Sequence, residues 1–214
     1  MQSHYSFVRS AIIAIAIISL NGCSNNENVI ELVLPTGSTV IALGDSLTFG
    51  QGASLDASYP VALAELSNWK VVNTGINGNT SADVLARIED VTAQNPNLVL
   101  LGVGGNDVLQ RIEPETTRAN ITATIDKLQA ANIPVVLIAQ PHFSVSALFG
   151  KASDNPIYQD IADSEGILLY ADGWSEVLSD DTLKSDKIHA NSAGYRQFAE
   201  GLYEYLQEKG VASE

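Results

Sequence analysis

The stretch Val40-Ile41-Ala42-Leu43-Gly44-Asp45-Ser46-Leu47 joins a short apolar run to a tight polar turn. Four consecutive apolar residues are typical of a strand that is buried on both faces, and Gly44 ends it. Further apolar runs follow at 71–72, 98–101, 135–139 and 167–170. Segments with the apolar spacing of helices separate them, at 59–66, 80–91, 114–131, 155–165 and 191–209. Alternating strands and helices predict a parallel sheet with helices on both faces.

Ser46 is a candidate nucleophile, because it lies two residues past the first strand, where a turn can lift its hydroxyl above the sheet edge. A serine hydroxyl needs a positioned base to take its proton. His189 is the candidate base, and Asp186, three residues earlier, can accept the imidazole Nδ1–H. Taken alone, the Ser46 run is equally compatible with an ordinary backbone turn, and an aspartate three residues before a histidine is common by chance in a surface turn before a helix. His142 has no carboxylate in an equivalent place, so we interpret it as a pocket or loop residue.

Two glycine-containing loops follow the second and third strands, around Gly78 and Asn106. Glycine lets a backbone N–H approach a ligand closely, and the start of a helix favours negative charge. Asn106 can donate a side-chain N–H from its loop to the oxyanion of an acyl-transfer reaction. We interpret Asp45 and Asp107, which lie beside these candidate residues, as carboxylates that shape the loops.

Residues 1–22 have the layout of a signal peptide, with Arg9 before an apolar run from Ala11 to Ile18 that is short for a membrane span. The only cysteine, Cys23, follows Gly22, which resembles a bacterial lipobox. The resemblance implies an acylated Cys23, a tether over residues 23–37, and an outer-membrane lipoprotein that faces the periplasm. The alternative is an ordinary signal peptide with an incidental cysteine, which would leave a soluble periplasmic or secreted protein.

Length and charge limit the number of domains and the kinds of partner that the chain can have. The 214 residues fit one domain, over residues 38–210, and the composition is that of a globular protein. There are 25 acidic residues against 11 basic ones, a formal net charge of −14. Such a surface repels phosphate backbones, so nucleic acid is an unfavourable partner.

Four sequence blocks, in this order, resemble those of the SGNH (GDSL) hydrolases: Gly44-Asp45-Ser46-Leu47, the loop with Gly78, Gly104-Gly105-Asn106-Asp107, and Asp186-Lys187-Ile188-His189. The resemblance spans about residues 40–209 and looks most like the bacterial arylesterase, acyl-CoA thioesterase I and lysophospholipase group. It implies a flavodoxin-like three-layer α/β/α sandwich with a five-stranded parallel sheet, and no metal or organic cofactor. It also implies that Ser46 is the nucleophile, His189 the base and Asp186 its orienting acid.

The same resemblance implies an oxyanion hole formed by the backbone N–H groups of Ser46 and Gly78 and by the side chain of Asn106. The chain departs from the usual pattern at two positions. Ala190 stands where the residue after the histidine is usually proline, and Asn79 stands where aspartate is usual. Neither departure removes a catalytic group.

Together these features predict a membrane-tethered serine esterase of the bacterial envelope, in which an acyl-enzyme on Ser46 is released by water that His189 activates. Short or medium acyl and aryl esters are the expected small-molecule substrates, followed by thioesters and lysophospholipids. Two alternatives stay open: an O-deacetylase of envelope polysaccharide, and a non-catalytic lipoprotein that binds an acyl ligand. Four residues after the fourth strand either line an acyl groove or pack under a loop: Phe143, Val145, Leu148 and Phe149.

Overall fold

The computed structural model describes residues 33–142 and 152–213. The predicted signal peptide, Cys23 and most of the tether lie outside the described residues. The four candidate groove residues, Phe143, Val145, Leu148 and Phe149, also lie outside them. No helix within the described ranges is long and apolar enough to cross a membrane.

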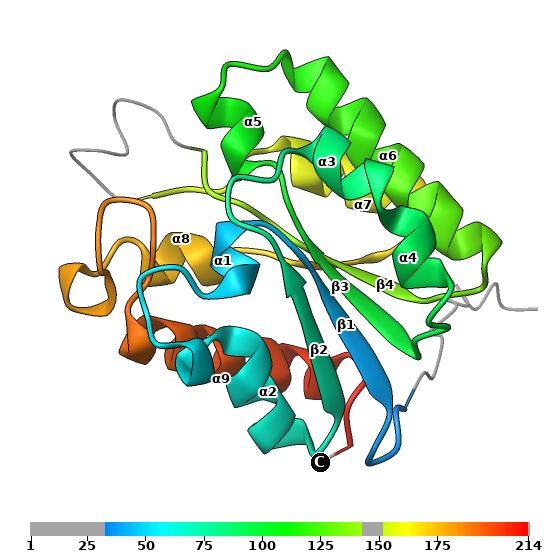
Figure 1. The fold of residues 1–214 in the computed structure, drawn as a ribbon, viewed down its shortest axis with the longest axis horizontal. Helices are drawn as coiled ribbons and strands as arrows, with labels where there is room; N and C mark the ends of the chain where they lie inside the picture. Colours follow the sequence, from blue (N-terminus) through cyan, green and yellow to red (C-terminus); the bar gives the residue numbers. More distant parts are fainter. Residues whose placement is uncertain (1–32, 143–151, 214) are drawn as a thin grey trace, which may run out of the picture. The chain divides into compact units, whose positions relative to one another are not determined.

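The core of the domain is a parallel sheet of five strands in the order β2-β1-β3-β4-β5 (Figure 1). The strands are β1 Thr39–Gly44, β2 Lys70–Gly75, β3 Leu98–Gly102, β4 Val135–Ile138 and β5 Leu168–Tyr170. Every neighbouring pair is parallel. The predicted five-stranded parallel sheet is therefore confirmed, although β2 runs two residues beyond the predicted end at Asn73.

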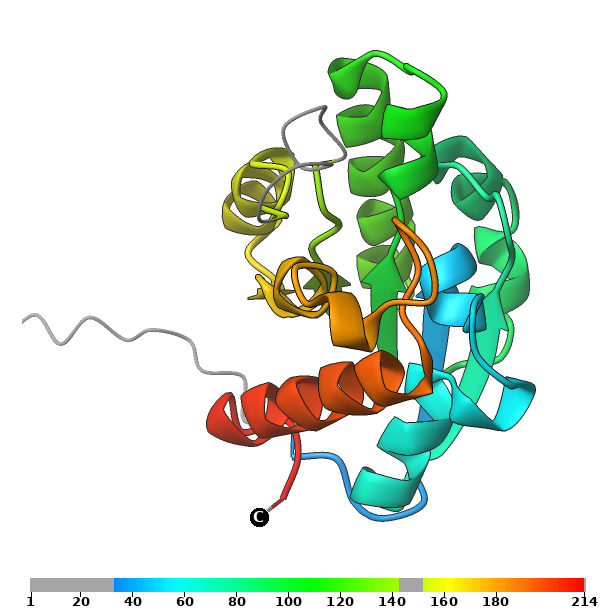
Figure 2. The same ribbon diagram turned by 90° about the vertical axis from the view of Figure 1, so that its left-hand side faces the viewer.

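Alternate side chains of each strand point to opposite faces, and each face is covered by its own helices (Figures 1 and 2). Val40 and Ala42 pack on one face, and Ile41 and Leu43 pack on the other. The first face is covered by α2 Tyr59–Ser67, α8 Gly173–Val177 and α9 Ser192–Glu208. The second is covered by α3 Ser81–Ala86, α4 Ile88–Thr92, α6 Pro114–Ala130 and α7 Ile157–Glu165. This arrangement confirms the predicted three-layer α/β/α architecture.

The segment 80–91 is not the single helix that its apolar spacing predicts. Helix α3 begins after Thr80, whose side chain forms a capping box with Asp83. It ends at Arg87, where the backbone leaves the helical region (φ −110°, ψ 13°), and α4 begins directly afterwards. The apolar residues of both short helices still face the same core, so the spacing predicts the buried side but misses the break.

Short helices at the carboxyl edge of the sheet are a second departure. Helix α1 (Ser46–Phe49) follows β1 and helix α5 (Gly105–Leu109) follows β3, where turns were expected. Two short 3₁₀ segments, Leu55–Ala57 and Asp181–Leu183, also lie in loops where no helix was expected.

Glycines at the strand ends allow α1 to lie directly on the sheet edge. Gly44 is paired with Gly75 on one side and Gly102 on the other. A Cβ on Gly44 would collide with the Gly102 carbonyl and the Thr48 hydroxyl. A Cβ on Gly75 would lie 2.7 Å from the Phe49 Cα. Because no side chains separate these segments, the position of α1 above the sheet is fixed closely.

Candidate active site

Ser46 is the first residue of α1, and its neighbour Asp45 caps that helix. The Asp45 Oδ1 accepts a hydrogen bond from the Leu47 N–H at 3.0 Å. Gly50 ends the helix with φ +99°, a conformation that glycine adopts without strain. The single turn between these two caps holds the Ser46 hydroxyl at the carboxyl edge of the sheet.

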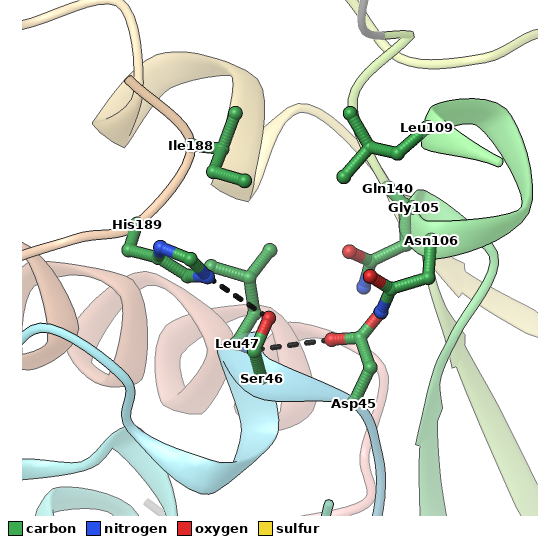
Figure 3. Close-up of a pocket in the computed structure, with 9 residues that line it drawn as sticks. All are labelled: Asp45, Ser46, Leu47, Gly105, Asn106, Leu109, Gln140, Ile188 and His189. Carbon is green, nitrogen blue, oxygen red and sulfur yellow. Dashed lines mark hydrogen bonds between the residues drawn. The ribbon is translucent and has the colours of Figure 1, made fainter. Parts of the chain in front are cut away.

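His189 meets Ser46 although 143 positions separate them. The distance from His189 Nε2 to Ser46 Oγ is 3.0 Å (Figure 3). On the other side of the ring, Nδ1 lies 2.8 Å from Asp186 Oδ2. The three side chains that the sequence singles out thus form one continuous hydrogen-bonded chain from carboxylate to imidazole to hydroxyl.

The Asp186 carboxylate is also held by backbone groups. Its Oδ1 accepts hydrogen bonds from the Ile188 and His189 N–H groups, each at 2.8 Å. Partial burial opposes ionisation, but the hydrogen bonds from His189 and Ile188 outweigh it and lower the pKa of Asp186. The group therefore stays ionised at neutral pH and can orient the imidazole.

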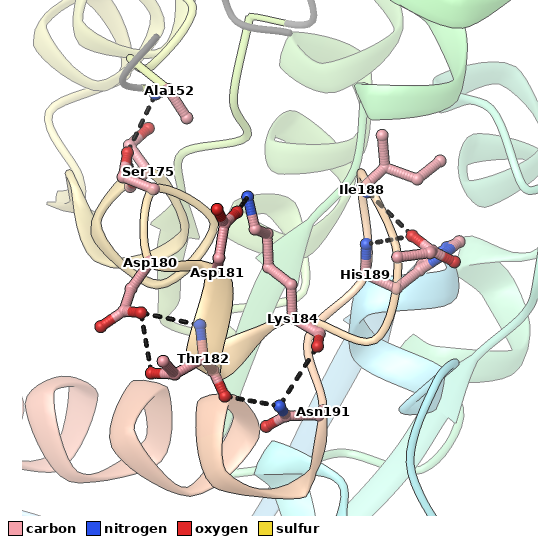
Figure 4. A network of polar contacts seen from close by, with 11 residues as sticks. Ala152, Ser175, Asp180, Asp181, Thr182, Lys184, Ile188, His189 and Asn191 are labelled. Atoms are coloured by element: carbon pink, nitrogen blue, oxygen red, sulfur yellow. Dashed lines mark hydrogen bonds and ion pairs between the residues drawn. The ribbon is translucent and has the colours of Figure 1, made fainter. Parts of the chain in front are cut away.

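The loop that carries His189 is fastened to the start of α9. Ser185 N–H donates to the His189 carbonyl at 3.0 Å, and Asn191 N–H donates to the Leu183 carbonyl at 2.8 Å. The Asn191 side chain donates to the Thr182 carbonyl at 2.8 Å and also to the Lys184 carbonyl (Figure 4). These bonds close the loop on both sides of the buried Ala190, without the usual proline.

Of the predicted oxyanion donors, Ser46 and Asn106 line the pocket and Gly78 does not. Asn106 lines the same pocket as Ser46, and its Nδ2 donates to the Asn79 carbonyl at 3.0 Å. Because the amide nitrogen carries two hydrogens, the second can still be donated to a ligand. Gly78 lies in the loop between β2 and α3, exposed and with φ +82°, and is not among the residues that line the pocket.

Arg87 connects the loops that carry these groups, and the sequence pattern does not identify it. Its Nη2 donates to the Gly44 carbonyl at 3.0 Å, and its Nε donates to Asn79 Oδ1 at 3.1 Å. Burial lowers the pKa of this guanidinium. Arg87 makes these contacts from the break between α3 and α4. The apolar spacing of this segment does not indicate the break.

Two buried carboxylates, Asp107 and Asp45, stand next to the candidate site residues Asn106 and Ser46 in the sequence. Asp107 is fully buried and accepts hydrogen bonds from the Ser81 N–H at 2.8 Å, from the Ser81 hydroxyl and from the Thr117 hydroxyl at 3.1 Å. Asp45 is also buried, and burial is the main reason that its pKa rises to about 7, with the nearby Asp107 adding to the effect. The hydrogen bonds of Asp107, and the bond from Leu47 N–H to Asp45, fit the predicted role of these carboxylates in shaping the loops.

The pocket above Ser46 has both polar and apolar walls (Figure 3). It is lined by Asp45, Ser46, Leu47, Gly105, Asn106, Leu109, Gln140, Ile188 and His189. Leu109, Ile188 and Gln140 were not predicted: Ile188 and Leu109 lie in or beside the motifs but carry no reactive group, and Gln140 has no motif around it. His142 is exposed and does not line the pocket. In the described ranges, no group of three or more histidine, cysteine or acidic side chains is placed to hold a metal ion.

Known proteins resemble this chain in sequence and in fold. Residues 42–197 match the GDSL-like lipase/acylhydrolase family. The chain is 30% identical to the Escherichia coli (strain K12) thioesterase 1/protease 1/lysophospholipase L1 over 79% of its own length and 83% of that protein. It is 27% identical to the Vibrio mimicus arylesterase over 61% of its own length and 68% of that protein.

A solved structure gives the same fold. The psychrotrophic esterase EstA from Pseudoalteromonas sp. superposes with a TM-score of 0.69 and 24% identity, covering 80% of this chain and 97% of that chain.

Proposed function

The chain belongs to the GDSL-like lipase/acylhydrolase family, and we propose that it hydrolyses carboxylic esters through an acyl-enzyme on Ser46. The observation that carries the proposal is the chain of contacts from Asp186 through His189 to Ser46 Oγ, at 2.8 and 3.0 Å. With Nδ1–H donated to Asp186, the free Nε2 lone pair faces the serine hydroxyl. This tautomer makes His189 a general base at the position where one is needed.

In the first half-reaction, Ser46 Oγ attacks the ester carbonyl while its proton passes to His189 Nε2. The negative charge moves to the carbonyl oxygen, where the Ser46 N–H, the second Asn106 amide hydrogen and the Gly78 N–H are the proposed donors. His189 then gives the proton to the leaving alcohol. In the second half-reaction, a water that His189 deprotonates attacks the acyl-enzyme and releases the acid.

Aryl esters and esters of short or medium acyl chains are the proposed substrates, with thioesters and lysophospholipids next. The names of the relatives support this range, because one is a thioesterase and lysophospholipase and another is an arylesterase. An acyl-CoA thioester is a less suitable substrate for an exported protein, since it is made in the cytosol.

Hydrolysis of p-nitrophenyl esters from acetate to dodecanoate by the purified full-length chain tests the proposal. We expect Ser46→Ala to reduce kcat/KM at least 10³-fold, while substitution of the exposed Ser54 by alanine leaves it unchanged. Equal rates in Ser46→Ala and wild type, or no hydrolysis of any ester by the wild type, would refute a serine esterase. Hydrolysis confined to acetyl esters and acetylated glycans would favour the deacetylase alternative.

We also propose that Cys23 is acylated after removal of residues 1–22 and that the protein is held at the outer membrane. The support is the lipobox-like sequence alone. Metabolic labelling with an alkyne fatty acid should label the wild type, and Cys23→Ser should lose both the label and sedimentation with membranes. Unlabelled wild-type protein would identify a soluble exported enzyme instead.

A further inference from the structure

Gln140 is a buried amide that neither half-reaction uses. It follows β4 at the carboxyl edge of the sheet, and only 1% of its surface is exposed. Its side-chain Oε1 and Nε2 have no hydrogen-bond partner among the residues that the structure describes. Its backbone carbonyl, by contrast, accepts a hydrogen bond from Asn155 N–H at 3.1 Å. A buried, unpaired amide destabilises a folded protein, so its presence calls for a partner that is supplied from outside.

The fold leaves a place for this amide beside the candidate nucleophile. Gln140 lines the same pocket as Ser46 and Asn106, and Figure 3 shows its amide end pointing toward the centre of that pocket. A Cβ on Gly102 would come within 3.1 Å of Gln140 Nε2. The absence of a side chain at Gly102 thus makes room for the amide next to the end of β3.

The position of the amide also indicates which part of a substrate it meets. The leaving alcohol must lie near His189, because His189 Nε2 returns the proton to it. Gln140 and Asn106 lie across the pocket from His189 (Figure 3). Because Asn106 is a proposed donor to the carbonyl oxygen on this side, the remaining part of an ester that can extend toward Gln140 is the acyl part.

We propose that Gln140 is a specificity-determining residue that binds a hydroxyl group on the acyl part of the substrate. A hydroxyl group is both donor and acceptor, so one such group can accept from Nε2 and donate to Oε1 of the same amide. The preferred substrates are then esters of short hydroxy acids. This inference rests on the proposed esterase function and specifies its substrate class.

Two pairs of p-nitrophenyl esters test the inference, because each pair exchanges a hydroxyl for a methyl group of similar size. The pairs are 2-hydroxypropanoate with 2-methylpropanoate, and 3-hydroxybutanoate with 3-methylbutanoate. The measured quantity is the ratio of kcat/KM within a pair, compared between wild type and Gln140→Met. Since the intrinsic reactivity of each ester cancels in this comparison, the change in the ratio reports the contact alone.

We expect Gln140→Met to lower the hydroxyl-to-methyl ratio by about 5- to 100-fold in at least one pair, the range of a lost hydrogen bond to a buried group. The exposed Gln94, substituted by methionine in the same way, should leave both ratios unchanged. We expect the thermal midpoint of Gln140→Met to equal or exceed that of the wild type, because the variant removes an unpaired buried amide.

A change of less than about fivefold in both ratios would overturn the inference. If the thermal midpoint also fell, the result would favour a permanently bound water as the partner of Gln140 instead. In either case the wild type would still hydrolyse the methyl-bearing esters, so the esterase proposal would stand. If the wild type hydrolysed none of the four esters and none of the acetate-to-dodecanoate series, the esterase proposal itself would fail.

Discussion

Asp45→Asn should change how the stability of the protein depends on pH. The folded protein holds the Asp45 proton more tightly than the unfolded chain does, since burial raises the pKa of this carboxyl from 3.8 to about 7. Between these two values the folded state binds more protons, so the free energy of unfolding falls as pH rises. The difference of about 3 units corresponds to roughly 4 kcal/mol that is present below pH 4 and lost by pH 7.

Asparagine has nearly the same shape and keeps an Oδ1 that can accept from the Leu47 N–H, but it does not ionise. The variant should therefore gain stability relative to the wild type as pH rises. Because the pI of about 4.4 limits solubility near pH 4, urea unfolding at pH 5 to 8 is the practical assay. About 2 kcal/mol of relative gain should accumulate between pH 5 and 7, with only about 0.4 kcal/mol more by pH 8.

The exposed Asp126 on α6 supplies the matched control, because Asp126→Asn removes one carboxylate without touching a buried one. Its stability difference from the wild type should stay within about 0.5 kcal/mol across the range. A difference between Asp45→Asn and wild type that is equally constant from pH 5 to 8 would refute the prediction, since Asp45 would then be as ionised in the folded protein as in the unfolded chain.

Three further substitutions follow from contacts at the strand ends and in the site. Gly44→Ala should lower the free energy of unfolding in urea by about 1–3 kcal/mol or more, because its methyl group meets the Gly102 carbonyl; a change below 0.5 kcal/mol would contradict the close packing there. Asp186→Asn should reduce kcat/KM for p-nitrophenyl butanoate by about 10³- to 10⁴-fold at an unchanged thermal midpoint, because the new amide can present N–H to His189 and favour the wrong tautomer; full activity would exclude an orienting role. Asp107→Asn should lower the free energy of unfolding in urea by about 2–3 kcal/mol. The carboxylate accepts three hydrogen bonds, and an amide would turn an N–H toward at least one of those donors. Wild-type stability of the variant would show that these bonds contribute little.

The sequence predicts the layers of this fold well because the apolar pattern is local. Runs such as Leu98 to Leu101 are apolar on both faces, as in buried strands. Their alternation with helical segments along the chain is enough to predict a parallel sheet. The break at Arg87 could not be predicted in this way. It depends on a guanidinium that reaches the Gly44 carbonyl, 43 positions earlier, and no local preference records such a contact.

Some residues of the candidate site could likewise be predicted from local sequence, and others could not. Ser46, Asp186 and His189 stand in short motifs with glycine or aspartate neighbours, so the sequence alone is enough to single them out. Gln140 follows an apolar strand and has no such neighbours, and its significance arises only from burial without partners. A residue whose role depends on what is missing around it is invisible to a search for motifs.

The 143 positions between Ser46 and His189 also set an order of events during synthesis. At about 5–20 residues per second, a ribosome takes roughly 7–30 s to add the base after it has added the nucleophile. The strands of the sheet are complete at Tyr170, so a growing chain can build its central layer before its chemistry exists. Chains that stop before residue 189 would carry the nucleophile but not hydrolyse esters, and esterase activity would count only molecules that were translated past His189.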